Sequence, residues 1–263
     1  MNNQEQALTL AATDSQLSGA DSIDFYEPTL RKALFPLYRE LMEAVEPFQN
    51  DPRGLCPFAV QWGPRFPKEE RSGILFVGRA TNGWVSFSND TEVLFGDTDE
   101  AIFNRKDQML WVHNLDGNKN GYNTRRSAFW NVIRGVSSTY YPHPELSYVA
   151  WSNVTKVAPD GANPSDKLYN AQLDVCQRIL AEEIRILSPR FVVFLTGHNW
   201  AIDFMRYLNG GDAPTRILKE PWGDYAARSY RIGETTLILS EHPMTKPEGV
   251  HIEAIRKIID ASL

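Results

Sequence analysis

Short, continuous apolar runs separated by helical stretches dominate the chain beyond residue 70. The runs cover residues 74–77, 148–151, 191–195 and 237–239. Because their apolarity is continuous rather than alternating, each run is typical of a strand covered on both faces, as in a parallel sheet between two helical layers. The pattern predicts an α/β fold: a three-layer α/β/α sandwich with a central, mainly parallel sheet.

Helical periodicity fills much of the remaining chain. Residues 27–48 carry apolar side chains at steps of three or four, and Pro36 predicts a kink or a restart within this helix. Residues 173–187 show the same spacing between the second and third runs, which makes a βαβ unit, and a Ser-Pro pair ends this helix. Residues 248–262 predict a closing helix.

The chain is expected to form one domain after a polar tail. Residues 1–22 are rich in Gln, Ser, Thr, Ala and Asp and predict a flexible segment, whereas residues 23–263 predict a single domain that begins with a helical extension. Within it, the Pro- and Gly-rich residues 51–67 predict an irregular connection in which Phe58 and Trp62 are buried.

Composition limits the class of protein. Hydrophobic residues make up 42% of the chain, charged residues 23%, and no apolar run approaches the length of about 20 residues that crosses a bilayer. The amino-terminal residues lack the basic and then apolar segments of a secretory signal. We therefore expect no membrane association and a cytoplasmic location; the oligomeric state is left open, with a monomer favoured.

The net charge of −6 comes from the amino-terminal residues 1–51. Residues 1–51 hold nine acidic and three basic side chains, while residues 52–263 hold 24 of each. The balanced part can carry a local basic face, so a nucleic-acid or nucleotide partner is compatible with the charge.

The cysteines argue against a metal centre. Cys56 and Cys176 are too few for a disulfide scaffold or an iron–sulfur cluster, and the five histidines show no close ligand spacing. We expect two reduced core thiols, no zinc, no iron–sulfur cluster and no other cofactor.

Polar residues follow three of the predicted strands, at the sheet edge where open α/β sheets bind ligands. Gly78 and Arg79 follow the first run, Asn153 the second and His242 the fourth. An Asn amide can read the edge of a nucleobase with two hydrogen bonds, and a His can donate to an anionic leaving group. Each residue alone is more often structural, as a strand cap or a satisfied buried histidine.

The usual nucleotide-binding loops are missing. Arg79 and Ala80 stand where a phosphate loop would need Lys and Ser or Thr, and the chain contains no G-x-G-x-x-G segment. The sequence thus excludes a phosphate-loop nucleoside-triphosphatase and the usual dinucleotide fingerprint.

Four short motifs follow one another along the chain: ILFVGRA at 74–80, WSNVTK at 151–156, a helix-to-strand segment at 176–193 and HPM at 242–244. In this order they resemble the uracil-DNA glycosylase superfamily, most closely its thermophile-type and related bacterial branches, whose first motif has alanine where the best-known branch has aspartate. The resemblance covers roughly residues 70–260. It implies a DNA-repair hydrolase that binds a flipped-out base and cleaves its N-glycosidic bond.

The resemblance also implies a base-binding set. Asn153 would read the pyrimidine edge, with Gly78 and Ala80 beside the base, and an aromatic residue from between the first two motifs would stack on the ring. Phe95 is our choice for this residue, although a buried core position explains it equally well. The alternatives are Phe87 and Trp84.

For catalysis, the resemblance implies that His242 hydrogen-bonds the base carbonyl oxygen as negative charge develops there. Asn82 could orient the attacking water. Basic residues that follow strand ends are candidate phosphate contacts. They are Arg79, Lys156 and Lys246.

The chain departs from the family pattern at several positions. Arg79 replaces the acidic residue of the nearest branch, Ala80 has no group to activate water, and Val157 stands where iron–sulfur members have a cysteine. The segment after the His-Pro motif is short, because the last predicted helix already begins at Glu248. Two hypotheses follow: a divergent N-glycosylase for uracil or a related base, and a non-catalytic nucleic-acid or nucleotide-binding protein on the same fold.

Overall fold

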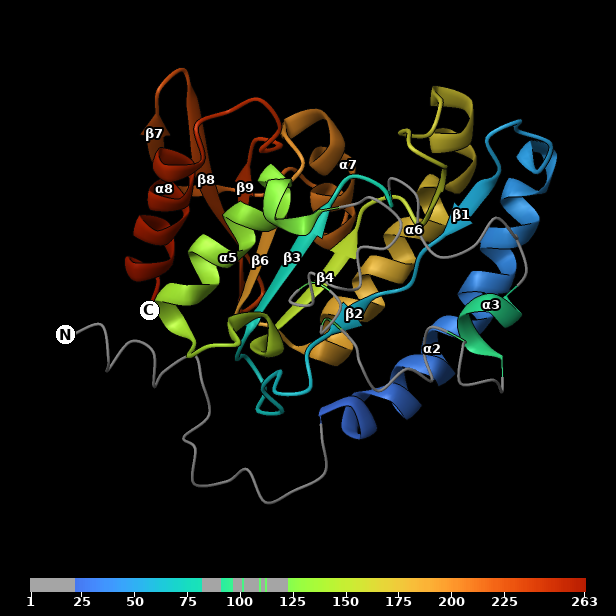
Figure 1. Ribbon diagram of the computed structural model, residues 1–263, viewed down its shortest axis with the longest axis horizontal. Coiled ribbons are helices and arrows are strands. Elements are labelled where there is room, and N and C mark those ends of the chain that lie inside the picture. Colours follow the sequence, from blue (N-terminus) through green and yellow to red (C-terminus); the bar gives the residue numbers. More distant parts are fainter. Residues whose placement is uncertain (1–21, 82–90, 97–100, 102–108, 110–111, 113–122) are drawn as a thin grey trace.

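The computed structural model describes residues 22–81, 91–96, 101, 109, 112 and 123–263 (Figure 1). A seven-stranded sheet forms its centre, in the order β2-β4-β3-β6-β9-β8-β7. Strands β4, β3, β6 and β9 run parallel, and the strands outside them pair antiparallel. The strands are β2 (Gln61–Trp62), β3 (Ile74–Gly78), β4 (Val149–Asn153), β6 (Phe191–Leu195), β7 (Arg216–Trp222), β8 (Tyr225–Ile232) and β9 (Thr235–Ser240).

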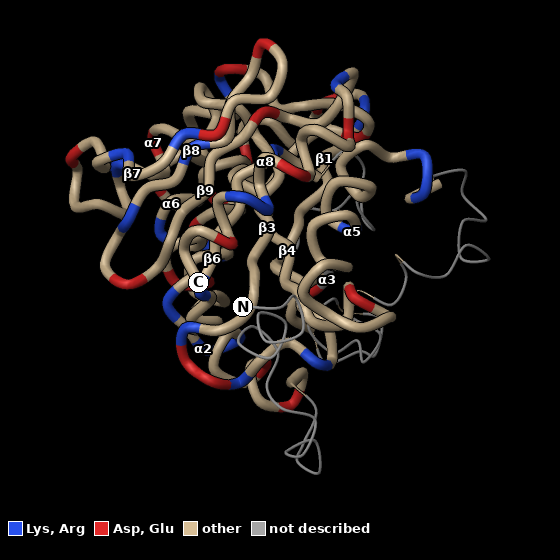
Figure 2. Tube along the Cα trace, turned by 90° about the vertical axis from the view of Figure 1, so that its left-hand side faces the viewer, with Lys and Arg blue, Asp and Glu red and all other residues tan. Residues whose placement is uncertain are grey.

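The predicted strands are confirmed, because each of the four apolar runs forms one of the parallel strands. Strand β3 shows why the runs are continuous: Leu75 and Val77 belong to one apolar cluster, and Ile74 and Phe76 belong to another. The four parallel strands β4, β3, β6 and β9 carry no Lys, Arg, Asp or Glu (Figure 2). Both faces of the sheet are therefore covered by apolar side chains.

Helices cover both faces of the sheet (Figure 1). Helices α2, α6 and α7 contribute to the first apolar cluster, and α5 and α8 contribute to the second. Within the described part of the chain, no helix is both long and apolar enough to cross a membrane. The helices are α2 (Ser22–Val45), α3 (Glu92–Phe95), α5 (Ala128–Tyr140), α6 (Asp166–Leu187), α7 (His198–Leu208) and α8 (Glu248–Asp260), with 3-10 turns η2 (Glu46–Phe48), η5 (Thr124–Arg126) and η6 (Glu145–Tyr148).

Helix ends follow local chemistry. Helix α6 begins where the Ser165 hydroxyl accepts a hydrogen bond from the Leu168 backbone N–H, and it ends at Ser188, whose φ of 44° lies in the left-handed region. This matches the predicted end before Pro189. Helix α2 continues through Pro36 as one element, so the alternative of a restart there is wrong.

The segment 51–67 is more regular than expected. It contains β2 and a short strand β1 (Leu55–Pro57), which pairs with β5 (Val157–Pro159) in a separate two-stranded sheet. Phe58 and Trp62 are buried, as predicted. Cys56 and Cys176 are buried free thiols, also as predicted.

Candidate functional site

The ends of the parallel strands bring the predicted polar residues to one edge of the sheet. Gly78 at the end of β3 is aligned with Asn153 at the end of β4, and the ends of β6 and β9 are aligned in the same way. The chain passes from β3 to β4 on one side and later to β6 on the other, so the strand order reverses at β3. Open α/β sheets bind their ligands at such a reversal, beyond the strand ends.

Asn153 lies against Gly78, and its amide group is incompletely bonded. The side chain is 1% exposed, and Nδ2 has no hydrogen-bond partner among the described residues. A Cβ atom at position 78 would lie 2.4 Å from Asn153 Oδ1, so only glycine allows this approach. An unsatisfied buried donor costs about 1–3 kcal/mol in stability. A ligand that accepts a hydrogen bond from Asn153 Nδ2 would therefore recover this free energy on binding.

Gly78→Ala is expected to lower the free energy of unfolding by about 1–3 kcal/mol through overpacking and to displace the Asn153 side chain. Urea unfolding measures the first effect. Gly249→Ala is the matched control, because a Cβ atom there meets nothing within 4 Å. Equal stability of the two variants would contradict the close approach of Asn153 to Gly78.

His242 is held as a neutral hydrogen-bond donor. Its Nδ1 accepts a hydrogen bond from the Met244 backbone N–H at 3.3 Å, so the proton of the neutral ring resides on Nε2. Burial, with a smaller contribution from the nearby positive charges of Arg79 and Lys246, lowers the pKa of His242 to about 4. At neutral pH the ring is therefore uncharged and presents Nε2–H.

Phe129 links the Asn153 and His242 positions. Its ring is stacked near that of His242, with 6.4 Å between centroids and an interplanar angle of 20°. The Cζ atom of Phe129 lies 3.2 Å from the position of a Cβ atom on Gly78. The sequence analysis missed Phe129, because an aromatic residue in the first turn of a helix also fits a core position; its place three residues after Arg126, the second of two adjacent arginines, was the available clue.

The expectation that Phe95 stacks on a base is wrong in this structure. Phe95 is 5% exposed and lies in edge-to-face contact with Phe35 and Tyr38 of α2, in the apolar cluster on the opposite face of the sheet from Phe129. The alternative explanation, that Phe95 is a buried core residue, is the correct one. Asn82, Trp84 and Phe87 lie outside the described residues.

Arg79 bridges the ends of β3 and β6. Its Nε donates to the Thr196 carbonyl oxygen at 2.7 Å, and its guanidinium carbon lies 5.6 Å from the centre of the Trp200 ring. Partial burial lowers its pKa, which the nearby Glu241 carboxylate opposes. Arg79 thus places a fixed positive charge at the reversal of strand order, while Ala80 beside it is half-buried and brings no polar group.

Glu241 is a second residue that the sequence analysis missed, although it directly precedes His242. A Cβ atom on Gly197 would lie 3.1 Å from Glu241 Oε2 and 3.5 Å from Arg79 Nη2, and Gly197 has a φ of +80°. The first motif has Arg79 where the nearest branch of the family has an acidic residue. Glu241 therefore supplies a carboxylate at the same edge of the sheet, from the loop after β9. Lys246 lies farther along the same loop, with its Nζ 5.1 Å from the centre of the Tyr225 ring.

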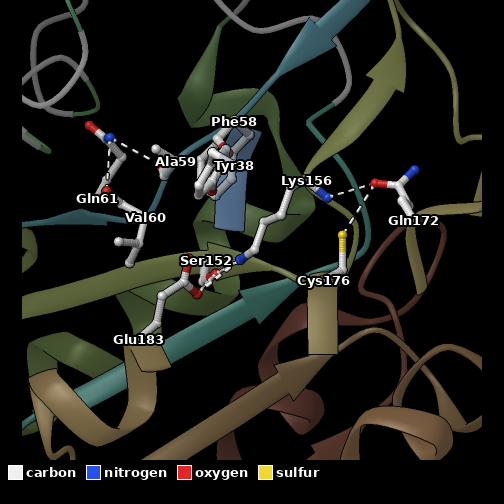
Figure 3. Close-up of polar contacts among 10 residues, drawn as sticks. All are labelled: Tyr38, Phe58, Ala59, Val60, Gln61, Ser152, Lys156, Gln172, Cys176 and Glu183. Atoms are coloured by element: carbon white, nitrogen blue, oxygen red, sulfur yellow. Dashed lines mark hydrogen bonds and ion pairs between the residues drawn. The ribbon is translucent and has the colours of Figure 1, made fainter. Parts of the chain in front are cut away.

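The expectation that Lys156 contacts phosphate is wrong in this structure. Its side chain is fully buried, and Nζ lies 2.9 Å from Glu183 Oε2 and 2.6 Å from Ser152 Oγ (Figure 3). The charge points back under β4 toward α6 instead of forward beyond the strand. Glu183 could have indicated this, because it lies on the buried face of α6 with Leu180 and Leu187. A buried carboxylate needs a buried cation as its partner.

In the described part of the chain, no group of three or more His, Cys, Asp or Glu side chains is arranged to hold a metal ion. A scan against protein-family models and a search of curated proteins both gave no match to the chain.

Proposed function

We propose that the protein binds a flipped-out nucleobase on a uracil-DNA glycosylase-like α/β/α sandwich and hydrolyses the N-glycosidic bond of uracil or a related base in DNA. The observation that carries the proposal is the buried amide nitrogen of Asn153, which has no hydrogen-bond partner in the described part of the chain and lies next to the Phe129 ring that stacks near His242. Together these residues offer an edge-reading amide, an aromatic face and a neutral donor at one end of the sheet.

Asn153 and Phe129 are suited to recognising the base. A pyrimidine such as uracil presents a donor and an acceptor side by side, which an Asn amide complements with Oδ1 and Nδ2. Aromatic side chains stack on flipped bases, and the half-buried Phe129 takes the role that we expected of Phe95. Gly78 leaves room for both side chains because it has no Cβ atom.

His242 and the nearby cations are suited to the chemical step. Cleavage of the bond to the sugar leaves negative charge on the base and positive charge on the sugar. The Nε2–H of neutral His242 can donate to the base carbonyl oxygen as that charge develops. The positive charges of Arg79 and Lys246 lie close enough to His242 to lower its pKa, and charges so placed favour an anionic leaving group.

A non-catalytic nucleic-acid or nucleotide-binding protein is the second candidate function. One observation favours it: Ala80 offers no group to activate water where the best-known branch of the superfamily has aspartate. Single-turnover cleavage of a uracil-containing single strand, measured together with binding of that strand, separates the two candidates. Cleavage by the wild type supports the glycosylase, and binding without cleavage supports the second candidate.

Ala80→Asp is expected to raise the cleavage rate if water activation limits the reaction, because the new carboxylate would stand directly after β3 at the edge that holds Asn153. Single-turnover rates of the wild type and the variant measure this, with Ala80→Asn as the control of similar size and no charge. Equal rates for the aspartate and asparagine variants would show that a carboxylate at this position does not act on the water. No cleavage by the wild type or by Ala80→Asp, with retained strand binding, would favour the non-catalytic candidate.

A further inference from the structure

The segment that carries Asn153 is closed into a ring by buried side chains. Ser152 and Lys156 lie on either side of Asn153, and Lys156 Nζ donates to Ser152 Oγ at 2.6 Å. Both also bind the same carboxylate oxygen on α6: Ser152 Oγ donates to Glu183 Oε2 at 2.6 Å, and Lys156 Nζ donates to it at 2.9 Å (Figure 3). All three side chains are inaccessible to solvent.

A second residue of α6 fixes the end of this segment. Gln172 Oε1 accepts hydrogen bonds from the backbone N–H groups of Lys156 and Val157, at 3.1 and 3.0 Å, and Gln172 Nε2 donates to the Val157 carbonyl oxygen at 2.8 Å. The Lys156 carbonyl oxygen in turn accepts from the Phe58 backbone N–H at 2.8 Å. The backbone on the carboxyl side of Asn153 is therefore bonded to two separate parts of the fold.

The remaining residues of the segment are bound to the last residue of β3 and to the residue that follows it. The Val154 N–H donates to the Gly78 carbonyl oxygen at 2.9 Å, and the N–H and hydroxyl groups of Thr155 donate to the Arg79 carbonyl oxygen at 3.0 and 2.9 Å. The polar side chains of this segment thus have partners, whereas Nδ2 of Asn153 has none among the described residues.

We infer that Lys156, Ser152 and Glu183, which we call the buried clamp, are positioning residues for Asn153. The inference rests on the proposed function, since it concerns the residue that would read the base. Asn153 is the second residue of this five-residue ring, so the clamp fixes the backbone on both sides of it, while its Nδ2 has no partner among the described residues. Such pre-positioning matters because a displacement of about 1 Å in a reacting arrangement can cost roughly 10²-fold in rate.

The test removes the clamp without leaving a charge behind. The variant Ser152→Ala/Lys156→Met/Glu183→Leu replaces all three groups by apolar ones of similar shape, a kind of change that buried ion pairs often tolerate without loss of stability. Ser152→Ala alone opens the ring while keeping the ion pair, and it serves if the triple variant does not fold. The control is Glu40→Gln/Arg178→Gln, which removes the exposed ion pair between α2 and the same helix α6.

Two measurements are made on folded variants. The first is the pair of side-chain amide resonances of Asn153 in ¹H–¹⁵N spectra, identified by their loss in Asn153→Asp. The second is single-turnover cleavage of a uracil-containing strand, with binding of that strand relative to a uracil-free one. With the clamp removed, we expect broadened or shifted Asn153 resonances, a cleavage rate lower by ~10²-fold and a reduced preference for uracil, with binding of the uracil-free strand unchanged. The control variant should keep wild-type values.

The outcomes separate the inference from the proposed function. Unchanged Asn153 resonances in both clamp variants, or an unchanged uracil preference despite shifted resonances, would overturn the positioning role. A wild-type protein that shows neither uracil preference nor cleavage would overturn the proposed function, and the resonances alone would then decide whether the clamp orients Asn153.

Discussion

His242→Ala is expected to lower the single-turnover rate of uracil cleavage by ~10²–10³-fold, which is the usual cost of removing one pre-positioned donor to a developing oxyanion. Binding of the strand should change little, since the lost hydrogen bond strengthens mainly as the bond to the sugar breaks. His143→Ala is a suitable control, because the His143 side chain is 84% exposed. Asn153→Ala should instead abolish the preference for uracil in binding. Undiminished cleavage in both site variants would refute the site.

The pH dependence of cleavage offers a check on the same histidine. Burial holds the pKa of His242 near 4, so the ring stays neutral down to about pH 5, where an ordinary histidine is mostly protonated. The cleavage rate is therefore expected to be nearly level between pH 5 and 8. A fall centred near pH 6.5 would show that His242 titrates as an exposed histidine does.

The low pKa of His242 also affects the pH dependence of the free energy of unfolding. Because the unfolded state binds the proton more readily than the folded state, the free energy of unfolding rises with pH between about 4 and 6.5. A histidine that gains a salt bridge on folding has the opposite effect.

Lys156→Ala is expected to lower the free energy of unfolding by about 3–5 kcal/mol, because removal of one partner leaves Glu183 buried without its counter-charge. The Glu183 Oε1 atom already has no hydrogen-bond partner among the described residues, and the Ser152 hydroxyl that donates to Oε2 is neutral and cannot replace the lost charge. Burial also raises the pKa of Glu183, and loss of the Lys156 charge, which lowers it, should raise it further. Urea unfolding measures the change in stability.

The matched control for this prediction is Arg178→Ala. Arg178 also joins α6 to another part of the chain, but its ion pair with Glu40 is partly exposed, and such pairs contribute about 0–1 kcal/mol. If Lys156→Ala were no more destabilising than Arg178→Ala, the Lys156–Glu183 pair would not be the buried, desolvated interaction that the geometry indicates.

The parallel strands could be predicted from the sequence, whereas the hairpin at the sheet edge could not. Strands covered on both faces lose their polar residues, so the apolar runs mark them clearly. Strand β7, by contrast, pairs only with β8 and alternates between exposed and partly exposed residues, among them Arg216, Ile217 and Lys219. Its apolar content is too low to distinguish it from a loop.

The sequence predicted which residues lie at the site edge of the sheet, but not where their long side chains point. The strand ends placed Asn153 and His242 at one edge, because parallel strands share their direction. The direction of a long side chain is not fixed by strand position, however. Lys156 follows a strand end as Arg79 does, yet it turns back to Glu183, and only the fold shows that Glu183 lies beneath β4. Phe129 comes from a helix, whose contact with Gly78 also depends on the fold.

Asn153 and His242 follow strands that are separated by β3 and β6 in the sheet. Neighbouring strands lie about 4.8 Å apart, so three intervals give roughly 14 Å between the backbones that carry the two residues. Hydrogen bonds across the sheet set the spacing of the strand ends, whereas His242 lies on the loop after β9 and is not fixed by that spacing. In the proposed site, adjustment to a base of another size is therefore expected from the loop that carries His242 and not from Asn153, which is the last residue of β4.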